Sequence, residues 1–376
     1  MRPYFFALCV LWLAFGVAQA QAPLQDPTTG ARYIVEEVSK ANFPVGMVFL
    51  PDGAMLYNEK TTGNVRLIHA DGTPQREPVL TLPTDALQER GMLGITIDPA
   101  FTDNGYVYVV HTRTGDARNY PTNTLVRFTL IDGEAQDVRT LARYPITTGE
   151  LLHNGGNVHF SPDGHLFLSL GDFGKPANAQ DLSVPQGKLL RFRLTEDGTL
   201  LPAVGNPYGD DNPAYAIGLR NPFDFTFDPV TGNLFSAEVG PSCDDEINLI
   251  LPGFNYGWDE GYQCSGRAVL ARYRPYMPPL LSFTPVIAPT GIAFYVGDAF
   301  PMWQNDLFFC DWNFGELRRV VLNSTRTGVE SVHLIPLGDA KCKLDLLVGA
   351  DGALYFGTVG AGGGAIMRLR PYEAGE

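Results

Sequence analysis

The sequence predicts an all-β protein folded as a six-bladed β-propeller. Six segments share one pattern, in which two short apolar runs flank a turn rich in Asp, Pro and Gly, as in a β-hairpin. Most of these hairpins are followed by another strand-like run with a basic or polar face. Units built only of strands that recur at roughly 40–50 residues are typical of propeller blades. The hairpins are expected at residues 43–56, 93–110, 153–172, 222–237, 290–309 and 344–357.

The turns and the following strands support this division. Pro51-Asp52-Gly53 turns the first hairpin, Asp103-Asn104-Gly105 the second and Pro162-Asp163-Gly164 the third. Residues 32–37 form a spare strand at the start, which we expect to complete the last blade and close the ring. The alternative is a β-sandwich or two all-β domains, but six similar units favour radial repetition. The following strands are predicted at residues 65–68, 125–128, 189–193, 246–249, 317–320 and 366–369.

The N-terminal segment has the pattern of a secretory signal peptide over residues 1–20. Arg2 supplies a positive start, residues 4–17 are apolar, and Ala18-Gln19-Ala20 is a small-x-small cleavage site. Residues 21–30 are a polar leader, and the propeller domain is expected over residues 31–372. No second apolar run has the length of a membrane span, so a periplasmic or secreted protein is predicted.

Composition and charge limit the range of partners. A formal net charge of −14 argues against nucleic acid and acidic membranes. It is compatible with a neutral substrate such as a sugar, and solubility alone explains it equally well. The 41 Gly and 29 Pro fit a chain with many turns.

Four cysteines remain once Cys9 leaves with the signal peptide, and an even number in an exported chain predicts disulfides. Of the three possible pairings we favour Cys243–Cys264, a local loop closure, which leaves Cys310–Cys342. The cysteine spacings do not suit zinc, because no tight Cys-x-x-Cys occurs.

Candidate functional residues fall where the hairpins begin and end, because propellers gather ligands at one mouth of the central channel. His153 starts the third hairpin and Asp172 ends it, so antiparallel strands bring them to one sheet edge. An imidazole beside a carboxylate suits a general base. Glu89, Arg220 and Asn221 occupy matching positions of other blades. Taken singly, each residue is explained by a turn, a cap or a structural histidine.

These motifs resemble those of the soluble pyrroloquinoline-quinone (PQQ) dependent glucose and aldose sugar dehydrogenases, the glucose/sorbosone dehydrogenase family. The resemblance covers nearly all of residues 43–370. It is carried by Glu89-Arg90-Gly91-Met92-Leu93-Gly94, the segment 153–172, Gly187-Lys188-Leu189-Leu190-Arg191, Gly218-Leu219-Arg220-Asn221-Pro222, Gly240-Pro241, Asp244-Asp245-Glu246-Ile247-Asn248 and Asn255-Tyr256-Gly257-Trp258.

The resemblance implies oxidation of an aldose at its anomeric hydroxyl, with PQQ over the channel mouth and an external electron acceptor. His153 would be the general base and Asp172 would orient it. Arg220 would polarise the reacting quinone carbonyl, and Asn221 would contact the cofactor. Glu89 stands where glucose-oxidising members have a sugar-contacting Gln.

The resemblance also implies Ca²⁺ joined to the quinone, held by the backbone carbonyls of Gly240 and Pro241.

The sequence departs from the family where relatives hold the cofactor's carboxylates with one Lys and two Arg. Asn313, Cys342 and Leu344 stand at those positions, with Lys341 and Lys343 nearby. These departures favour an alternative, a non-catalytic extracellular propeller of the same family that binds a protein or glycan. A third hypothesis is a calcium-dependent lactonase, for which the sequence shows no set of converging carboxylates.

Overall fold

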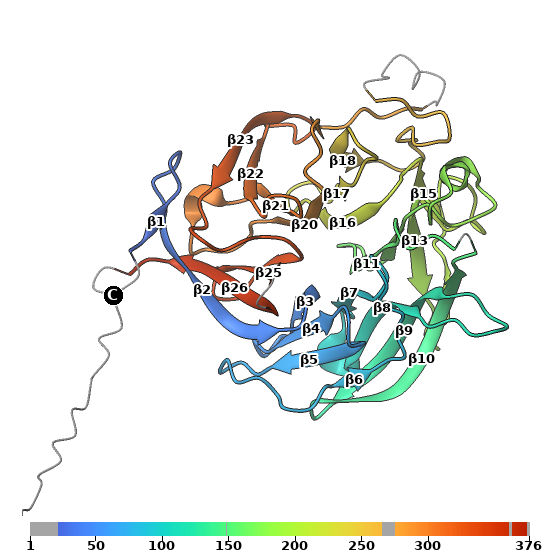
Figure 1. Ribbon diagram of the computed structural model, residues 1–376, viewed down its shortest axis with the longest axis horizontal. Coiled ribbons are helices and arrows are strands. Elements are labelled where there is room, and N and C mark those ends of the chain that lie inside the picture. The colour runs from blue at the N-terminus through green and yellow to red at the C-terminus, as the bar shows by residue number, and fades with distance from the viewer. Residues whose placement is uncertain (1–21, 148, 265–274, 361–362, 374–376) are drawn as a thin grey trace, which may run out of the picture.

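Six small antiparallel sheets stand in a ring around a central channel, as Figure 1 shows for a computed structural model of the chain. The structure describes residues 22–147, 149–264, 275–360 and 363–373. The predicted signal peptide, residues 1–20, lies outside the described residues. The predicted six-bladed β-propeller is confirmed.

The blades follow one another along the chain, and in blades 1 to 5 the innermost strand comes first. Blade 1 comprises β3 (Pro44–Phe49), β4 (Met55–Glu59), β5 (Asn64–Ile68) and β6 (Leu80–Thr81). Blade 2 comprises β7 (Met92–Ile97), β8 (Tyr106–Arg113), β9 (Thr122–Ile131) and β10 (Glu134–Pro145). Blade 3 comprises β11 (Gly155–Phe160), β12 (Leu166–Leu170), β13 (Lys188–Leu194) and β14 (Leu200–Pro202), and β15 (Ala214–Ile217) also pairs with β13.

Blade 4 comprises β16 (Pro222–Phe227), β17 (Leu234–Glu238), β18 (Asp245–Ile250) and β19 (Leu281–Phe283). Blade 5 comprises β20 (Pro289–Phe294), β21 (Leu307–Asp311), β22 (Leu317–Leu322) and β23 (Val329–Ile335). Blade 6 comprises β24 (Leu346–Val348), β25 (Leu354–Gly360) and β26 (Gly363–Pro371), with β2 (Arg32–Ala41) and β1 (Leu24–Gln25) outside them. The helical turns are α1 (Phe101–Asn104), η1 (Pro176–Gln180) and η2 (Pro301–Trp303).

The N-terminal strand closes the ring, as predicted. β2 pairs antiparallel with β26, and Val35 lies opposite Leu369. This pairing joins the two ends of the chain in one sheet, so the first and last blades cannot separate without breaking a full strand ladder. β1 lies within the predicted polar leader and adds an outer strand to the same sheet.

The apolar faces of neighbouring blades pack on one another and form the core. One cluster joins blades 5 and 6 around Trp303, Phe308 and Phe356, all fully buried. The innermost strands approach so closely that a Cβ added to Gly94 would lie 2.5 Å from Asn157 Oδ1. The innermost strands are therefore tightly packed at this level of the channel.

Most predicted turns are confirmed, and one differs. Pro51-Asp52-Gly53 and Pro162-Asp163-Gly164 connect paired strands. Between β7 and β8 the chain forms the single turn of α1, which Gly105 ends in the left-handed conformation at φ 65°. Glycine adopts this conformation without a Cβ clash, so it can end a helical turn as well as a hairpin.

Both predicted disulfides are confirmed. Cys243 is bonded to Cys264, and Cys310 at the end of β21 is bonded to Cys342. The second bond ties blade 5 to the segment that leads into blade 6. Across the described ranges, the helices are too short and too polar to span a bilayer.

Candidate active site at the channel mouth

The predicted pair of His153 and Asp172 is formed at the mouth. His153 Nδ1 lies 2.7 Å from Asp172 Oδ1, and Asp172 is fully buried. In the tautomer that donates its Nδ1 hydrogen to this carboxylate oxygen, Nε2 of the neutral imidazole is the acceptor. His153 has a positive φ of 58°, an uncommon conformation that sits at the start of the third hairpin. The geometry suits a histidine held ready to accept a proton.

Trp258 completes this pair, and sequence reasoning did not assign it a role. Its indole Nε1 donates to Asp172 Oδ2 at 2.8 Å, while the Gly174 backbone N–H donates to Asp172 Oδ1 at 2.7 Å. Together these contacts fix the orientation of the carboxylate toward His153. Trp258 lies 86 residues from Asp172 in the chain. No sequence spacing could reveal a contact that blade packing alone creates.

Arg220 is held beside this chain of contacts by a buried carboxylate. The backbone N–H groups of Arg220 and Asn221 donate to Glu238 Oε1 at 2.7 and 2.8 Å. The Arg220 side chain donates to Val239 O at 2.9 Å, and its guanidinium lies 5.5 Å from the Trp258 ring. Burial lowers the pKa of Arg220, although Glu238 nearby opposes this shift. The guanidinium is thus a fixed, desolvated charge.

Glu238, at the end of β17, was not predicted as a site residue. Burial raises the pKa of Glu238 to about 8, despite the backbone donors on one of its oxygens. Its second oxygen, Oε2, has no hydrogen-bond partner within the described part of the chain. Both observations favour a protonated carboxylic acid, because a neutral group avoids the cost of burying a negative charge without a full set of partners.

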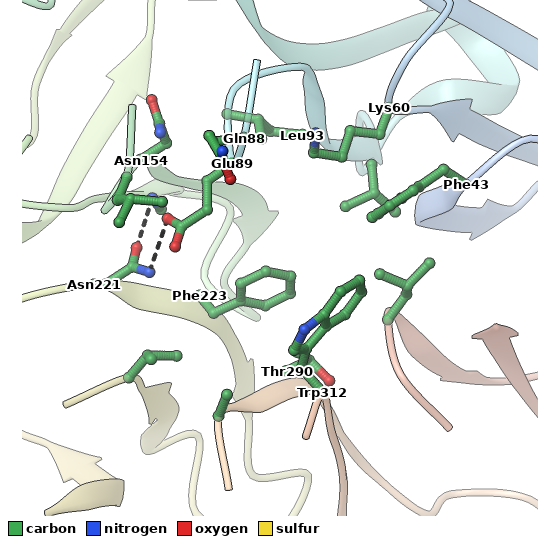
Figure 2. A pocket seen from close by; sticks show the side chains of 16 residues that line it. Phe43, Lys60, Gln88, Glu89, Leu93, Asn154, Asn221, Phe223, Thr290 and Trp312 are labelled. Carbon is green, nitrogen blue, oxygen red and sulfur yellow. Dashed lines mark hydrogen bonds between the residues drawn. The ribbon is translucent and has the colours of Figure 1, made fainter. Parts of the chain in front are cut away.

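Glu89 joins three blades at the mouth. Its Oε2 accepts the His153 backbone N–H at 2.6 Å and the Asn221 side-chain amide at 3.2 Å. Asn221 Oδ1 in turn accepts the Gly155 N–H at 3.0 Å, and Figure 2 shows this arrangement. Glu89 therefore fixes the backbone that carries His153, in addition to its predicted place against the substrate.

A cavity of about 280 Å³ opens beside these residues, and all six blades contribute to its lining. Its polar members include Glu89, Asn221, Lys60 and Thr290. The larger part of its wall is apolar or aromatic and includes Phe43, Val45, Leu93, Leu152, Phe223, Val239, Ala288, Trp312 and Leu344. Asn154, which follows His153, and Asn221, which follows Arg220, line this cavity. His153 and Arg220 themselves are not among its lining residues.

A second, much smaller hollow of about 20 Å³ adjoins Arg220 and includes Gly240 and Pro241. Asp244, Glu246 and Glu238 also line it, so the hollow is rich in oxygen atoms. In the described residues no three His, Cys, Asp or Glu side chains converge as a metal site. A cation here would accordingly depend on backbone carbonyls, the arrangement implied for calcium.

Blades 5 and 6 present a different wall. Asn313 donates its side-chain amide to Val286 O at 3.0 Å, and Cys342 is buried in its disulfide. Leu344 lines the 280 Å³ cavity, and the Phe43 and Trp312 rings stack with centroids 5.8 Å apart. None of the three positions expected to carry a cation does so. The Lys343 ammonium lies 5.0 Å from the centroid of the Trp312 ring instead.

The fold and the mouth together define a six-bladed propeller in which a histidine paired with a buried aspartate lies beside a guanidinium. The sequence matches the family described as Glucose / Sorbosone dehydrogenase over residues 41–368. The chain belongs to this family.

Relatives within and around the family differ in what their names state. The Escherichia coli aldose sugar dehydrogenase YliI is 28% identical over 353 residues, which cover 88% of this chain and 91% of that protein. The PQQ-bound aldose sugar dehydrogenase of Streptomyces coelicolor has a similar structure, with a TM-score of 0.73, 26% identity, and coverage of 90% and 98%. The human Hedgehog-interacting protein is 30% identical over 154 residues, which cover 37% of this chain and 22% of that protein.

Proposed function

We propose that this protein is an exported, PQQ-dependent sugar dehydrogenase that oxidises an aldose at its anomeric hydroxyl. The observation that carries the proposal is the chain of contacts from Trp258 through Asp172 to His153, formed beside Arg220 at the channel mouth. An imidazole with a fixed tautomer next to a desolvated cation suits removal of a hydroxyl proton and stabilisation of developing negative charge.

His153 would accept the proton of the anomeric hydroxyl on Nε2. Asp172 would stabilise the resulting imidazolium, because it is fully buried and cannot be screened by water. A positioned base of this kind contributes about 10²–10⁴-fold to a rate. Bound PQQ would supply the two-electron acceptor, and an external electron acceptor would complete the turnover.

The quinone end of PQQ fits the residues present. Arg220 and Asn221 supply donors, and their backbone is locked by Glu238. A Cβ on Gly240 would lie 2.3 Å from Cys243 O, so only glycine permits the tight turn that carries the Gly240 and Pro241 carbonyls. These carbonyls, with the acidic hollow around them, are the residues that would hold Ca²⁺.

Export to the periplasm or the cell exterior is part of the proposal. The signal-peptide pattern of residues 1–20 supports it, and so do the two disulfides, which persist in oxidising compartments.

The decisive experiment is reconstitution of the purified mature protein with PQQ and Ca²⁺. Binding is followed by absorbance, and sugar-dependent reduction of a dye is followed with a panel of aldoses. The His333→Ala variant is a matched histidine control, because His333 lies on β23 and bonds to Ser331. Binding of PQQ without turnover of any aldose would contradict the proposed reaction.

The second candidate function is a non-catalytic propeller that binds a protein or glycan. The disulfide of Cys342 and the apolar Leu344 favour it, because they stand where cofactor-gripping cations were expected. The partial match to a protein named for an interaction is in keeping with this candidate. Failure of PQQ to bind at millimolar concentration would favour it over the dehydrogenase.

A further inference from the structure

Lys60 is a buried cation in the mouth that neither the motifs nor the catalytic contacts account for. It follows β4 in blade 1, is 7% exposed, and lines the 280 Å³ cavity. Figure 2 shows its side chain lying along the cavity, between Phe43 and the loop that carries Gln88 and Glu89. Lysine is rarely buried to this extent without a partner.

The ammonium of Lys60 has no hydrogen bond or ion pair to any residue that the structure describes. The negative charges that act on it are those of Glu89 and Asp85. Asp85 is paired with Arg90 at 2.9 Å, and Glu89 accepts two hydrogen bonds, from His153 and Asn221. Both carboxylates are therefore engaged elsewhere, and neither lies within ion-pair distance of Lys60.

The surroundings hold the Lys60 side chain in this place. Its ammonium lies 5.1 Å from the Phe43 ring centroid, and Phe43 stacks on Trp312. A Cβ added to Gly91 would lie 2.5 Å from Lys60 Cγ, so the stem of the lysine packs against backbone. Burial lowers the pKa of Lys60, while Glu89 and Asp85 oppose this effect. The cost of holding an ammonium here is recovered if a ligand brings an anionic group.

We propose that Lys60 is the residue on which the mouth receives a carboxylate of its ligand, which is a PQQ carboxylate if the proposed function holds. Blade 1 stands across the ring from blade 4, which carries Arg220 and Asn221 (Figure 1). A ligand whose quinone end contacts blade 4 extends over the Phe43 and Trp312 rings toward Lys60. Lys60 thus replaces part of the cationic grip that Asn313, Cys342 and Leu344 do not provide.

A carboxylate could also come from an acidic sugar, and the test separates the two sources. Isothermal calorimetry is performed on the mature protein with PQQ plus Ca²⁺, and separately with glucuronate, each with wild type, Lys60→Met and Lys343→Met. Lys343 is the matched control, because its ammonium also lies beside a mouth aromatic but outside the cavity lining. The expected result is a dissociation constant for PQQ about 10- to 100-fold weaker in Lys60→Met, since a charge-assisted contact is lost.

Lys343→Met is expected to change that constant less than threefold, a difference too small to signal loss of a charge-assisted contact. Equal PQQ binding by wild type and Lys60→Met would overturn the inference and leave the proposed function standing. No PQQ binding by wild type, with Lys60-dependent binding of glucuronate, would overturn the proposed function and keep the carboxylate site. A larger loss in Lys343→Met than in Lys60→Met would also overturn the assignment to Lys60.

Thermal unfolding of the ligand-free variants gives a second readout that does not depend on PQQ. Lys60→Met is expected to unfold at a higher temperature than wild type, because methionine buries the same stem without an unpaired charge. A lower unfolding temperature than wild type would mean that the folded protein already satisfies this ammonium, and the inference would be wrong.

Discussion

The two sides of the channel mouth are built from different chemistry. Blades 3 and 4 present His153, Asp172 and Arg220, held by directed hydrogen bonds. Blades 5 and 6 present Trp312, Leu344 and a buried disulfide, which offer shape and apolar surface but no cation at the expected positions. Under the proposed function, the reaction centre and the ligand grip would vary independently, because each depends on loops of different blades.

The largest effect is expected where the histidine itself is removed. His153→Ala is predicted to lower kcat by about 10²–10⁴-fold, the contribution of a positioned general base, with PQQ affinity nearly unchanged. Steady-state kinetics on the reconstituted protein measure it, and PQQ titration serves as the control. Full turnover by His153→Ala would show that the polar side of the mouth does not carry the chemistry.

A positive charge added to the apolar side of the mouth tests whether that side contacts the ligand. Asn313→Lys is predicted to tighten PQQ binding roughly tenfold, the lower end for a charge-assisted contact, because position 313 is exposed and water would screen the charge of the new lysine. Calorimetry measures the change. Unaltered affinity at low salt would mean that the ligand does not reach blade 5.

A smaller effect is expected when the Asp172 carboxylate loses one of its hydrogen-bond donors. Trp258→Phe removes the indole donor to Asp172 and keeps the ring beside Arg220, so kcat is predicted to fall about three- to tenfold. The acid limb of the kcat/KM profile should move to higher pH. Without the indole donor, the Asp172 carboxylate carries more negative charge and stabilises the protonated form of His153 more strongly. An unmoved pH profile would assign Trp258 a packing role alone.

The smallest expected effect is on stability, through Glu238. Its folded-state pKa of about 8 lies above the ordinary value, so the folded protein binds more protons than the unfolded chain between those values. The stabilisation is complete below the ordinary glutamate pKa and is lost as pH rises through about 8. Glu238→Gln should therefore flatten the fall of the unfolding temperature between pH 5 and 9. A parallel fall in both proteins would show that Glu238 is ionised in the folded state.

The sequence alone predicted the fold because blade hairpins are local. The turn at Pro51-Asp52-Gly53 and the alternating strands beside it are readable within about 15 residues, and the spare strand at 32–37 was the natural partner of the last blade. The pairing of His153 with Asp172 was predictable for the same reason, since one hairpin carries both.

Contacts between blades were decided only by the tertiary structure. Trp258 of blade 4 supports Asp172 of blade 3, which lies 86 residues away in the chain. Glu238 supports its own blade 4, and neither it nor Lys60 bears a motif of its own. Whether a lysine is buried, and whether the carboxylates near it are already engaged, depends on how six sheets pack around one channel. Local pattern thus determined the blades and the pairing of His153 with Asp172. Packing between blades decided that Trp258 contacts Asp172 and that Lys60 is buried in the cavity wall. Burial and distance depend on the assembled ring and not on local sequence.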